Sequence, residues 1–366
     1  MSCGMSTFLT VLKQRLEERE EAEFDAEFRP IMSYQETDWQ GFLRLDDNKS
    51  ELFKLLAEHA ASINSEKEVI TTYGKEVLCS QQRGDLLRLA PCTHEEADTR
   101  MFLHAADAVN QGHQKIMLRT VDSDVLVLAT AMVQQLQQVS TTIELWVAFG
   151  TGKNLRYLAA HEISASLGKE MSKALPFFHA FTGCDTTSSF AGKGKKTAWT
   201  TWISYQEATQ VFSSLSSVPE SITNEWTATI ERFVALMYDR TSTEVNVNDA
   251  RMKLFCRKGR ALEAIPPTQA ALLQHTKRAV YQAGHCWGQT LLVRPHLPSP
   301  TGWGWVFGAN GWQPFWTNLP EVTASCRELV KCGIGCTKGC RGNCSCKKSN
   351  LNCTALCSCS EECANN

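Results

Sequence analysis

Two sets of side chains in this sequence have the types and the spacing that metal chemistry requires. The first set consists of three acidic clusters: Glu95–Asp98, Asp122–Asp124 and Asp185. Carboxylates that converge from several elements are the hard oxygen ligands of Mg²⁺ and Mn²⁺, and two such ions can hold a phosphodiester during in-line displacement. The clusters therefore predict a divalent-metal centre, with Glu96 as the inward carboxylate of the first cluster and Glu95 as its alternative.

A run rich in glycine and lysine follows the third acidic cluster. The stretch Gly183–Lys196 reads as a helix–hairpin–helix-like turn that leads into a new helix. Backbone amides at a helix start, together with lysine side chains, suit the phosphate backbone of DNA. The residues that we expect to contact phosphate are Gly192, Lys193, Gly194, Lys195 and Lys196.

The second set is the C-terminus, where ten cysteines lie between Cys326 and Cys363 and a Cys-x3-Cys-x-Cys unit occurs twice. Little apolar material accompanies them, so zinc binding would have to supply the folding energy. Four thiolates complete one tetrahedral Zn²⁺, and nine can serve three ions only if some sulfurs bridge. We expect three structural zinc ions, held by Cys332, Cys336, Cys340, Cys344, Cys346, Cys353, Cys357, Cys359 and Cys363. A disulfide-linked tail is the alternative, and the absence of a signal-peptide pattern disfavours it.

The overall composition bounds the remaining possibilities. The chain has 366 residues, 43% of them hydrophobic, which suits two or three globular domains. A net charge of -2 means that any nucleic-acid binding must come from local patches. No apolar run approaches the roughly 18 residues of a membrane span, so no membrane partner is expected.

Helix and strand patterns alternate around the acidic clusters. The pattern predicts an amphipathic helix from Ala97 to Val109, a strand at Lys115–Thr120, a helix from Val125 to Gln138 and a strand at Glu144–Gly150. Arg156–Phe181 reads as mostly helical, with a break at Gly168 and a bend at Pro176. Such alternation indicates an α/β fold with a largely parallel sheet, in which sites form at the carboxyl ends of strands, where Asp122 and Asp124 lie.

Weaker patterns surround this central region. Asn48 is expected to cap a helix, and Glu68–Tyr73 and Asp85–Leu89 read as short strands. Residues 199–260 read as helical, with a buried stripe formed by Trp226, Ile230, Phe233, Val234 and Met237. In the following Pro-, Gly- and Trp-rich stretch, we expect Trp287, Trp303, Trp305, Trp312 and Trp316 to pack loops against the body; stacking on bases is the alternative.

The three acidic motifs resemble those of the structure-specific 5′ nucleases of the flap-endonuclease type, over about residues 90–200. In that family, a Glu-Ala-Glu pair opens a helix, Asp-x-Asp follows a strand, and Gly-Cys-Asp precedes two closely spaced glycines. Here Glu96–Asp98, Asp122–Asp124 and Gly183–Asp185 with Gly192 and Gly194 are similar. The resemblance implies a PIN-like fold, with a mostly parallel sheet flanked by helices. It also implies phosphodiester hydrolysis with Mg²⁺ or Mn²⁺, with Glu96, Asp98, Asp122, Asp124 and Asp185 as catalytic ligands.

The sequence departs from this nuclease pattern in several places. The family carries further metal-binding aspartates near its N-terminus, whereas residues 1–60 contain no apolar strand that ends in aspartate. Thr186 stands where the family has tyrosine, and Lys193 where it has an apolar residue. These departures leave open a protein that binds DNA without cleaving it.

The cysteine-rich tail resembles the tesmin-type CXC domain, a three-zinc DNA-binding module. Cys344–Leu351 matches its Cys-x-Cys-Lys-Lys signature, and Cys353–Cys363 matches its second half. The front half departs, since Cys332 and Cys336 stand three residues apart and Asn343 replaces an aromatic residue. The resemblance implies contacts with DNA by Lys338, Arg341, Lys347 and Lys348.

These observations predict five segments: an N-terminal helical arm (1–45), a PIN-like α/β domain (46–200), a helical extension (201–285), a linker (286–325) and the zinc domain (326–366). Three functions remain open: a DNA nuclease targeted by the zinc module, a non-catalytic DNA-binding protein, and a zinc-dependent protein-interaction scaffold. A nuclear location and an origin in a mobile element follow from this architecture as expectations.

Overall fold

The computed structural model describes most of the chain between residues 41 and 317 and a few positions near the C-terminus. The described residues are 41, 43–81, 83, 86–256, 264–309, 311–317, 340, 345–348, 353, 357 and 365. The chain divides into two compact units, one formed by Met1–Ile163 with Gln289–His296 and the other by Ser164–Gly288 with Leu297–Asn366. The expected N-terminal arm lies almost wholly outside the described residues. No helix in the described part is long and apolar enough to cross a membrane.

The first unit opens with helix α4 (Asp46–Ser62) and a hairpin of β1 (Ile70–Tyr73) and β2 (Glu76–Cys79). The expected cap at Asn48 is wrong, because the N-cap residue of α4 is Leu45, three residues earlier. Asp46 and Asp47 occupy its first turn, where carboxylates interact favourably with the helix dipole.

The predicted strand at Asp85–Leu89 is also wrong in its described part. Leu89 lies in a turn, fully buried beside Val77 and Leu103.

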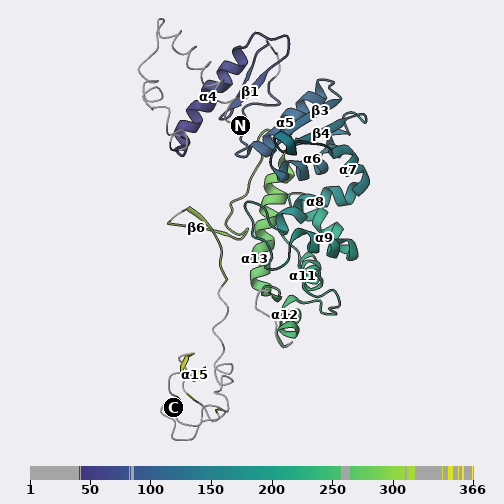
Figure 1. Cartoon of the computed structure of the whole chain (residues 1–366), viewed down its shortest axis with the longest axis vertical. Coiled ribbons are helices and arrows are strands. Elements are labelled where there is room, and N and C mark those ends of the chain that lie inside the picture. Colours follow the sequence, from purple (N-terminus) through teal and green to yellow (C-terminus); the bar gives the residue numbers. More distant parts are fainter. Residues whose placement is uncertain are drawn as a thin grey trace. The chain divides into compact units, whose positions relative to one another are not determined.

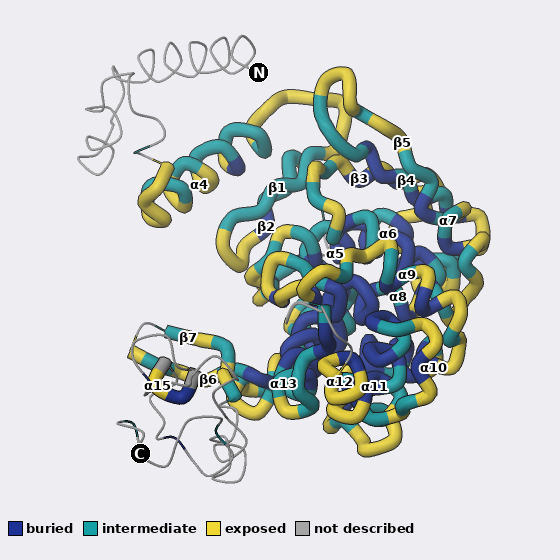
Figure 2. Tube along the Cα trace, turned by 60° about the horizontal axis from the view of Figure 1, so that its bottom comes forward, coloured by how far each residue is buried: buried dark blue, intermediate teal, exposed yellow. Residues whose placement is uncertain are grey.

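The central sheet of the first unit contains β3 (Lys115–Thr120), β4 (Glu144–Phe149) and β5 (Arg156–Ala159), in that order. Figure 1 labels β3 and β4, and Figure 2 labels all three strands. Helix α5 (Ala97–Asn110) precedes β3, and helix α6 (Ser123–Leu136) connects β3 to β4. The pair β3–β4 is parallel, and the pair β4–β5 is antiparallel. The sequence therefore located α5, β3, α6 and β4 correctly. It missed β5, which makes the sheet mixed.

Burial in this sheet follows the two-residue period of a strand. Ile116 and Leu118 of β3 are buried, whereas Met117 between them is exposed. Leu145 and Val147 are fully buried in β4, which occupies the centre of the sheet. Helix α5 contacts β3, and α6 contacts β4 and α5. The unit is thus a mixed α/β structure with small sheets, one of which contains a parallel pair.

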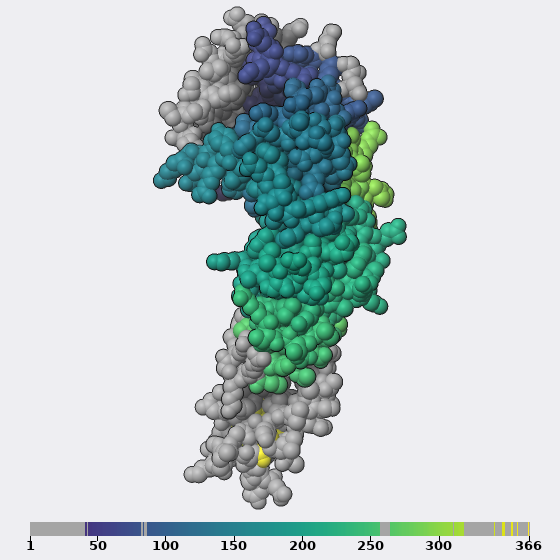
Figure 3. All heavy atoms as spheres, turned by 90° about the vertical axis from the view of Figure 1, so that its right-hand side faces the viewer, coloured from purple at the N-terminus to yellow at the C-terminus, as the bar shows by residue number. Residues whose placement is uncertain are grey.

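The second unit is mainly helical. Its helices include α8 (Lys169–Phe181), α9 (Lys195–Ser204), α10 (Glu207–Leu215), α11 (Asn224–Tyr238), α12 (Val247–Phe255) and α13 (Gln269–Val280), and α7 (Ala160–Leu167) spans the division between the units. Figure 2 shows their buried inner faces in dark blue, and Figure 3 shows their space-filling surface in teal to green. Phe181 is fully buried and packs on Phe177, Phe212 and Phe233.

The expected burial in α11 is confirmed for four of the five residues in the predicted stripe. Ile230, Phe233, Val234 and Met237 are buried, while Trp226 is half-buried. Each buried position follows the previous one by one or three residues, so the side chains share a face of the helix. That face forms part of the aromatic core of the second unit.

Further elements of the second unit come after α13 in the chain. A π-helical segment, η4 (Tyr281–Cys286), continues α13, and β6 (Trp305–Gly308) and β7 (Gly311–Pro314) form an antiparallel hairpin. Trp287 is fully buried, as expected for a tryptophan that packs a loop against the body. The same expectation is wrong for Trp312 and Trp316, which are exposed.

Candidate metal and nucleic-acid sites

The Asp122–Asp124 turn is fixed by hydrogen bonds among neighbouring residues. Asp122 is the N-cap residue of α6, and its Oδ1 accepts the backbone N–H of Asp124 at 2.8 Å. The N–H of Asp122 in turn donates to Thr120 Oγ1 at 2.9 Å. Both aspartates are half-buried. The turn therefore holds two carboxylates at the carboxyl end of a strand in the parallel pair, a usual place for ligand sites in α/β proteins.

The first acidic cluster lies at the start of α5. Glu96 is the N-cap residue and is half-buried, whereas Glu95 is exposed. The Thr99 hydroxyl donates to the Glu96 carbonyl at 3.1 Å, which ties this cap to the first turn. Asp98 lies in the same turn and is half-buried. The difference in exposure favours Glu96 over Glu95 as the inward carboxylate of the cluster.

The five predicted carboxylates belong to two different units. Glu96, Asp98, Asp122 and Asp124 are in the first unit, and Asp185 is in the second. Among the described residues of the first unit, no three carboxylates place oxygen atoms within 4.8 Å of one another. Two ions that share a site can divide their ligands between them, so such a group is not a requirement. The single acidic centre therefore stays a prediction.

The loop Gly183–Gly194 joins α8 to α9 and contains the third acidic cluster. Gly183 has a φ of 110°, and a Cβ on it would lie 3.0 Å from the Cβ of Ser189, so the position requires glycine. Thr187 is the internal clasp of the loop. Its buried hydroxyl donates to the Ala180 carbonyl and accepts the N–H of Cys184 at 3.2 Å. Asp185 is exposed between these bonded residues.

Residues far away in the sequence also hold this loop. The Thr186 hydroxyl donates to Gln282 Oε1 at 3.0 Å, from η4. The Tyr238 hydroxyl, at the end of α11, donates to the Ala191 carbonyl at 3.2 Å. The ring of Phe190 lies 5.0 Å from that of Phe181. The loop is therefore attached to three other elements of the second unit.

His275 of α13 makes the remaining attachment. Its Nε2 lies 2.7 Å from the Phe181 carbonyl, which fixes the proton on that nitrogen. Its Nδ1 then accepts the Ser188 hydroxyl at 3.4 Å. Burial lowers the pKa of His275 to about 4, so the ring is neutral at pH 7. A neutral, buried imidazole thus links α13, α8 and the loop.

The lysines of the glycine-rich run differ in their surroundings. Lys195 Nζ donates to the carbonyls of His179 at 2.9 Å and Gly183 at 2.6 Å, and to the Thr182 hydroxyl at 3.1 Å. These bonds place its charge at the C-terminus of α8, where a cation is favourable. Lys193 lies over the ring of Tyr238, 5.1 Å from its centroid. Lys196 is exposed, and Gly194 is the N-cap residue of α9. Phosphate binding by this run stays a prediction.

The cysteines near the C-terminus form a group that could bind a metal such as zinc. The Sγ atoms of Cys346, Cys353 and Cys357 all lie within 4.8 Å of one another. Cys353 Sγ is also 3.3 Å from Cys340 Sγ. Burial, followed by the nearby Cys357 and Cys353 thiols, raises the pKa of Cys346 to about 12. Zinc would displace such protons, so its binding should weaken in acid.

The other predicted contacts of the zinc domain fall largely outside the described residues. Helix α15 (Ser345–Lys348) carries Lys347, which is exposed. The predicted residues that lie outside the described part of the chain are Cys332, Cys336, Cys344, Cys359, Cys363, Lys338 and Arg341, together with the unassigned Cys326.

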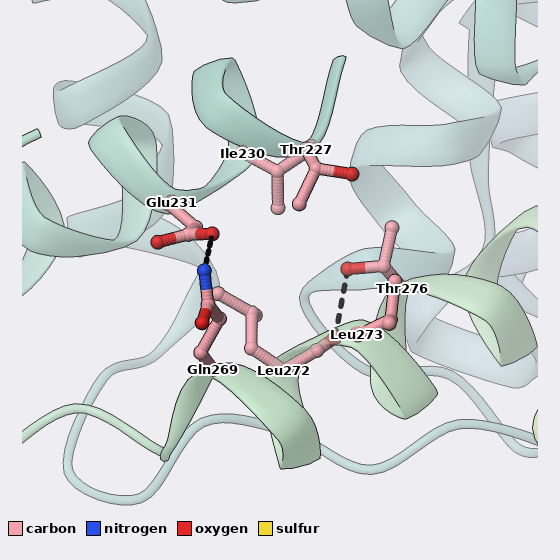
Figure 4. A pocket seen from close by; sticks show the side chains of 7 residues that line it. All are labelled: Thr227, Ile230, Glu231, Gln269, Leu272, Leu273 and Thr276. Atoms are coloured by element: carbon pink, nitrogen blue, oxygen red, sulfur yellow. Dashed lines mark hydrogen bonds between the residues drawn. The ribbon is translucent and has the colours of Figure 1, made fainter. Parts of the chain in front are cut away.

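A small pocket in the second unit is lined by residues of α11 and α13 (Figure 4). Its acidic residue, the buried Glu231, accepts Gln269 Nε2 at 2.6 Å and the backbone N–H of Val247 at 2.9 Å. Both carboxylate oxygens are thus used to join α11, α12 and α13. These hydrogen bonds account for the burial of the Glu231 carboxylate without a ligand, so we assign no ligand to the pocket.

Sequence reasoning missed the residues that hold the Gly183–Gly194 loop. Tyr238, His275 and Gln282 lie 47 to 96 residues from their partners in the chain. No local spacing connects them to Asp185. The folded chain gives one indication that the sequence does not: Gln282 lies in a π-helical segment, and such segments are frequent at functional sites.

Comparison of the chain with family models, with curated proteins and with solved structures finds no match in any of the three.

Proposed function

We propose that this protein binds DNA through a zinc-dependent module at its C-terminus and carries a nuclease-like α/β region before it. The proposal depends above all on the gathered thiols of Cys346, Cys353 and Cys357, with Cys340 beside them. Thiolates at such separations suit tetrahedral zinc. Lys347, exposed on α15 next to Cys346, supplies a cation for a DNA phosphate.

The full module would contain three zinc ions and nine cysteine ligands, as the resemblance to CXC domains implies. The position of Cys353, close both to Cys340 and to the Cys346–Cys357 pair, supports its assignment as a ligand that bridges two ions. Metal analysis of the purified full-length chain should find about three zinc ions per chain. A content near one ion would contradict the three-ion module.

Lys347 and Lys348 should contact phosphate rather than bases. In the Lys347→Ala, Lys348→Ala double variant, affinity for duplex DNA should fall for every sequence. The slope of log affinity against log salt should become shallower by about 2, because each lost phosphate contact contributes about 0.9. A matched control removes two exposed lysines of the first unit, Lys54 and Lys67, and should leave the slope unchanged. If the slope is unchanged in the Lys347→Ala, Lys348→Ala variant, these lysines do not contact the DNA phosphates.

A second candidate function, phosphodiester hydrolysis, is favoured by the Asp122–Asp124 turn. Two half-buried carboxylates lie at the carboxyl end of β3, beside its parallel neighbour β4. This arrangement is compatible with the PIN-like fold implied by the nuclease resemblance, which remains a proposal. Glu96 and Asp98, which belong to the same unit, would complete the ligands for Mg²⁺ or Mn²⁺.

This second function can be tested without disturbing the α6 cap. In the Asp122→Asn, Asp124→Asn double variant, the amide oxygen at 122 can still accept the bond to residue 124, because asparagine caps helices about as well as aspartate. Mn²⁺ should raise the unfolding temperature of the wild-type chain and not that of the variant. If Mn²⁺ leaves the wild type unaffected, the acidic centre and the nuclease function are both wrong, while DNA binding by the zinc module is untouched.

A zinc-dependent protein-interaction scaffold is the third possibility. It predicts zinc binding with no affinity for DNA, so the duplex-binding measurement separates it from the first proposal. A nuclear location and an origin in a mobile element belong to the same proposal, since both follow from the pairing of a nuclease-like region with a DNA-binding zinc module.

A further inference from the structure

The β6–β7 hairpin and the two residues that follow it expose aromatic side chains that most proteins would bury. The exposed fractions are 67% for Phe307, 46% for Trp312, 47% for Phe315 and 77% for Trp316. We call these four residues the hairpin patch. Large aromatic rings contribute most when they are buried, and several exposed aromatic rings on one short segment are typical of an interaction site.

The geometry of the hairpin leaves ring faces uncovered. Phe307 and Trp312 are cross-strand partners, so their side chains lie on the same face of the hairpin. Their ring centroids are 5.2 Å apart with an interplanar angle of 72°. In such an edge-to-face pair, one ring presents its edge to the other, so flat π-surface remains available to a third ring.

The base of the hairpin is attached firmly to the helical body of the second unit. The Phe315 N–H donates to the Gly304 carbonyl at 2.8 Å, and Arg278 of α13 donates to the same carbonyl at 3.2 Å. A Cβ on Gly304 would lie 2.6 Å from the Gln274 carbonyl, so backbone and helix touch there. The hairpin therefore projects from a fixed base at α13 (Figures 1 and 2).

The charge of this region suits a polyanion. No aspartate or glutamate occurs between Glu263 and Glu321, whereas the half-buried Lys277 lies in the helix that supports the hairpin. Its neighbour Arg278 is buried against the Gly304 carbonyl. A phosphate backbone near the patch would therefore meet no carboxylate from this stretch of chain. The lack of acidic residues in this stretch, a lysine in the supporting helix and the exposed aromatic rings together fit a stacking surface for nucleic-acid bases.

We propose that the hairpin patch binds single-stranded nucleic acid by stacking unpaired bases on Trp312 and Trp316. Duplex bases are stacked on one another, so only an unpaired strand offers its base faces to the patch. None of the residues in the hairpin patch is a proposed zinc ligand. The chain would thus contain one site for duplex phosphates and another for unpaired bases.

The test compares binding of a labelled oligothymidine with binding of a duplex of the same length by the zinc-loaded full-length chain. In the Trp312→Leu, Trp316→Leu double variant, affinity for oligothymidine should fall by at least about fivefold for each ring removed. Affinity for the duplex should change by less than about twofold, because the zinc module binds through phosphate. The Trp312→Phe, Trp316→Phe variant keeps aromatic faces and should retain most of the affinity.

Phe255 supplies the matched control. It is 66% exposed in the same unit but lies outside the hairpin, so Phe255→Leu should leave oligothymidine binding unchanged. Normal oligothymidine binding by the double leucine variant would overturn the proposal, as would equal losses on duplex and single strand. Loss of self-association in that variant, with oligothymidine binding intact, would instead identify the patch as a protein interface and also overturn it. Lys347→Ala with Lys348→Ala tests the zinc module separately, through the duplex.

Discussion

The Asp122–Asp124 turn and the Gly183–Gly194 loop both present aspartates between two regular elements, but they are held in different ways. The turn is fixed by bonds between residues two positions apart, Asp122 with Asp124 and with Thr120. The loop is fixed by its own Thr187 clasp and by side chains from α11, α13 and η4. A local network can form as soon as its helix does, whereas the loop requires the assembled second unit.

The difference has a consequence for function. The turn should keep its shape whenever β3 and α6 are folded, so its two carboxylates are preorganised for binding a cation. The exposed Asp185 depends on Tyr238, His275 and Gln282, none of which is near it in the chain. Changes in the helical body of the second unit should therefore alter Asp185 and leave Asp122 unaffected.

The largest effect on this comparison should come from Phe190→Ala. Phe190 is buried and contacts both Phe181 and His275, each with ring centroids 5.0 Å apart. Truncation leaves a cavity in the aromatic core, so the free energy of unfolding should fall by about 3 to 5 kcal/mol. Chemical denaturation monitored by tryptophan fluorescence measures this change. Phe307→Ala, at an exposed ring, should change it by less than about 0.5 kcal/mol; equal losses would contradict the assigned burial.

Acid should weaken the loop through His275. The unfolded chain takes up a proton on this residue below its ordinary pKa of 6.5, whereas the folded chain does so only below about 4. The unfolded state therefore binds more protons in this window, and stability falls as the pH is lowered from about 6.5 to about 4. The loss attributable to His275 should approach about 3 kcal/mol.

The control for this pH dependence is His275→Gln, which can still donate to the Phe181 carbonyl but does not titrate. Denaturation midpoints measured across this pH range should vary less in the variant than in the wild type. His296→Gln, which changes an exposed histidine of the first unit, should leave the profile of the second unit unaltered. If the denaturation midpoints of the wild type and of His275→Gln depend on pH in the same way, His275 does not cause the loss of stability in acid.

The internal clasp of the loop is tested by Thr187→Val. The substitution keeps the shape and removes the hydroxyl that bonds to Ala180 and Cys184. The cost should be about 1 to 3 kcal/mol, because a buried carbonyl loses its donor. Thr200→Val removes an exposed hydroxyl that bonds to the Lys196 carbonyl and should cost less. Hydrogen exchange at the loop amides would show whether the loss is local.

The smallest effect should come from the cap of α6. Asp122→Ala removes the acceptor for the Asp124 N–H and should cost about 1 kcal/mol, whereas Asp122→Asn should be close to neutral. Thermal unfolding of both variants measures the difference. If alanine and asparagine have the same effect, the side chain of Asp122 does not cap the helix in solution.

Much of the first unit could be predicted from the sequence because its signals are local. The periodicity of α5 and the apolar run of β3 give their bounds nearly residue by residue. The error at Arg156–Ala159 has a tertiary cause. This segment pairs antiparallel with β4, which overrides its helical pattern.

The candidate sites divide in the same way. Asp122 could be placed at a strand end from sequence because the turn is local. The attachment of the Gly183–Gly194 loop could not, because its partners lie on other helices and carry no motif. The exposure of Trp312 and Trp316 was missed for a related reason: aromatic content indicates packing on average, and only the folded chain shows which rings find a core.

The central claim is that zinc held by the C-terminal cysteines enables DNA binding. The most direct measurement is the affinity of the full-length chain for duplex DNA before zinc chelation, after chelation, and after zinc is added back. The Cys353→Ser variant is measured in parallel, and Cys256→Ser, which changes an exposed cysteine, is the control. We predict that zinc chelation and the Cys353→Ser substitution each abolish most of the affinity for duplex DNA. Adding zinc back should restore this affinity in the wild type and in Cys256→Ser, but not in Cys353→Ser. Adding Mg²⁺ in place of zinc should not restore it. Duplex affinity that survives chelation unchanged would contradict the claim.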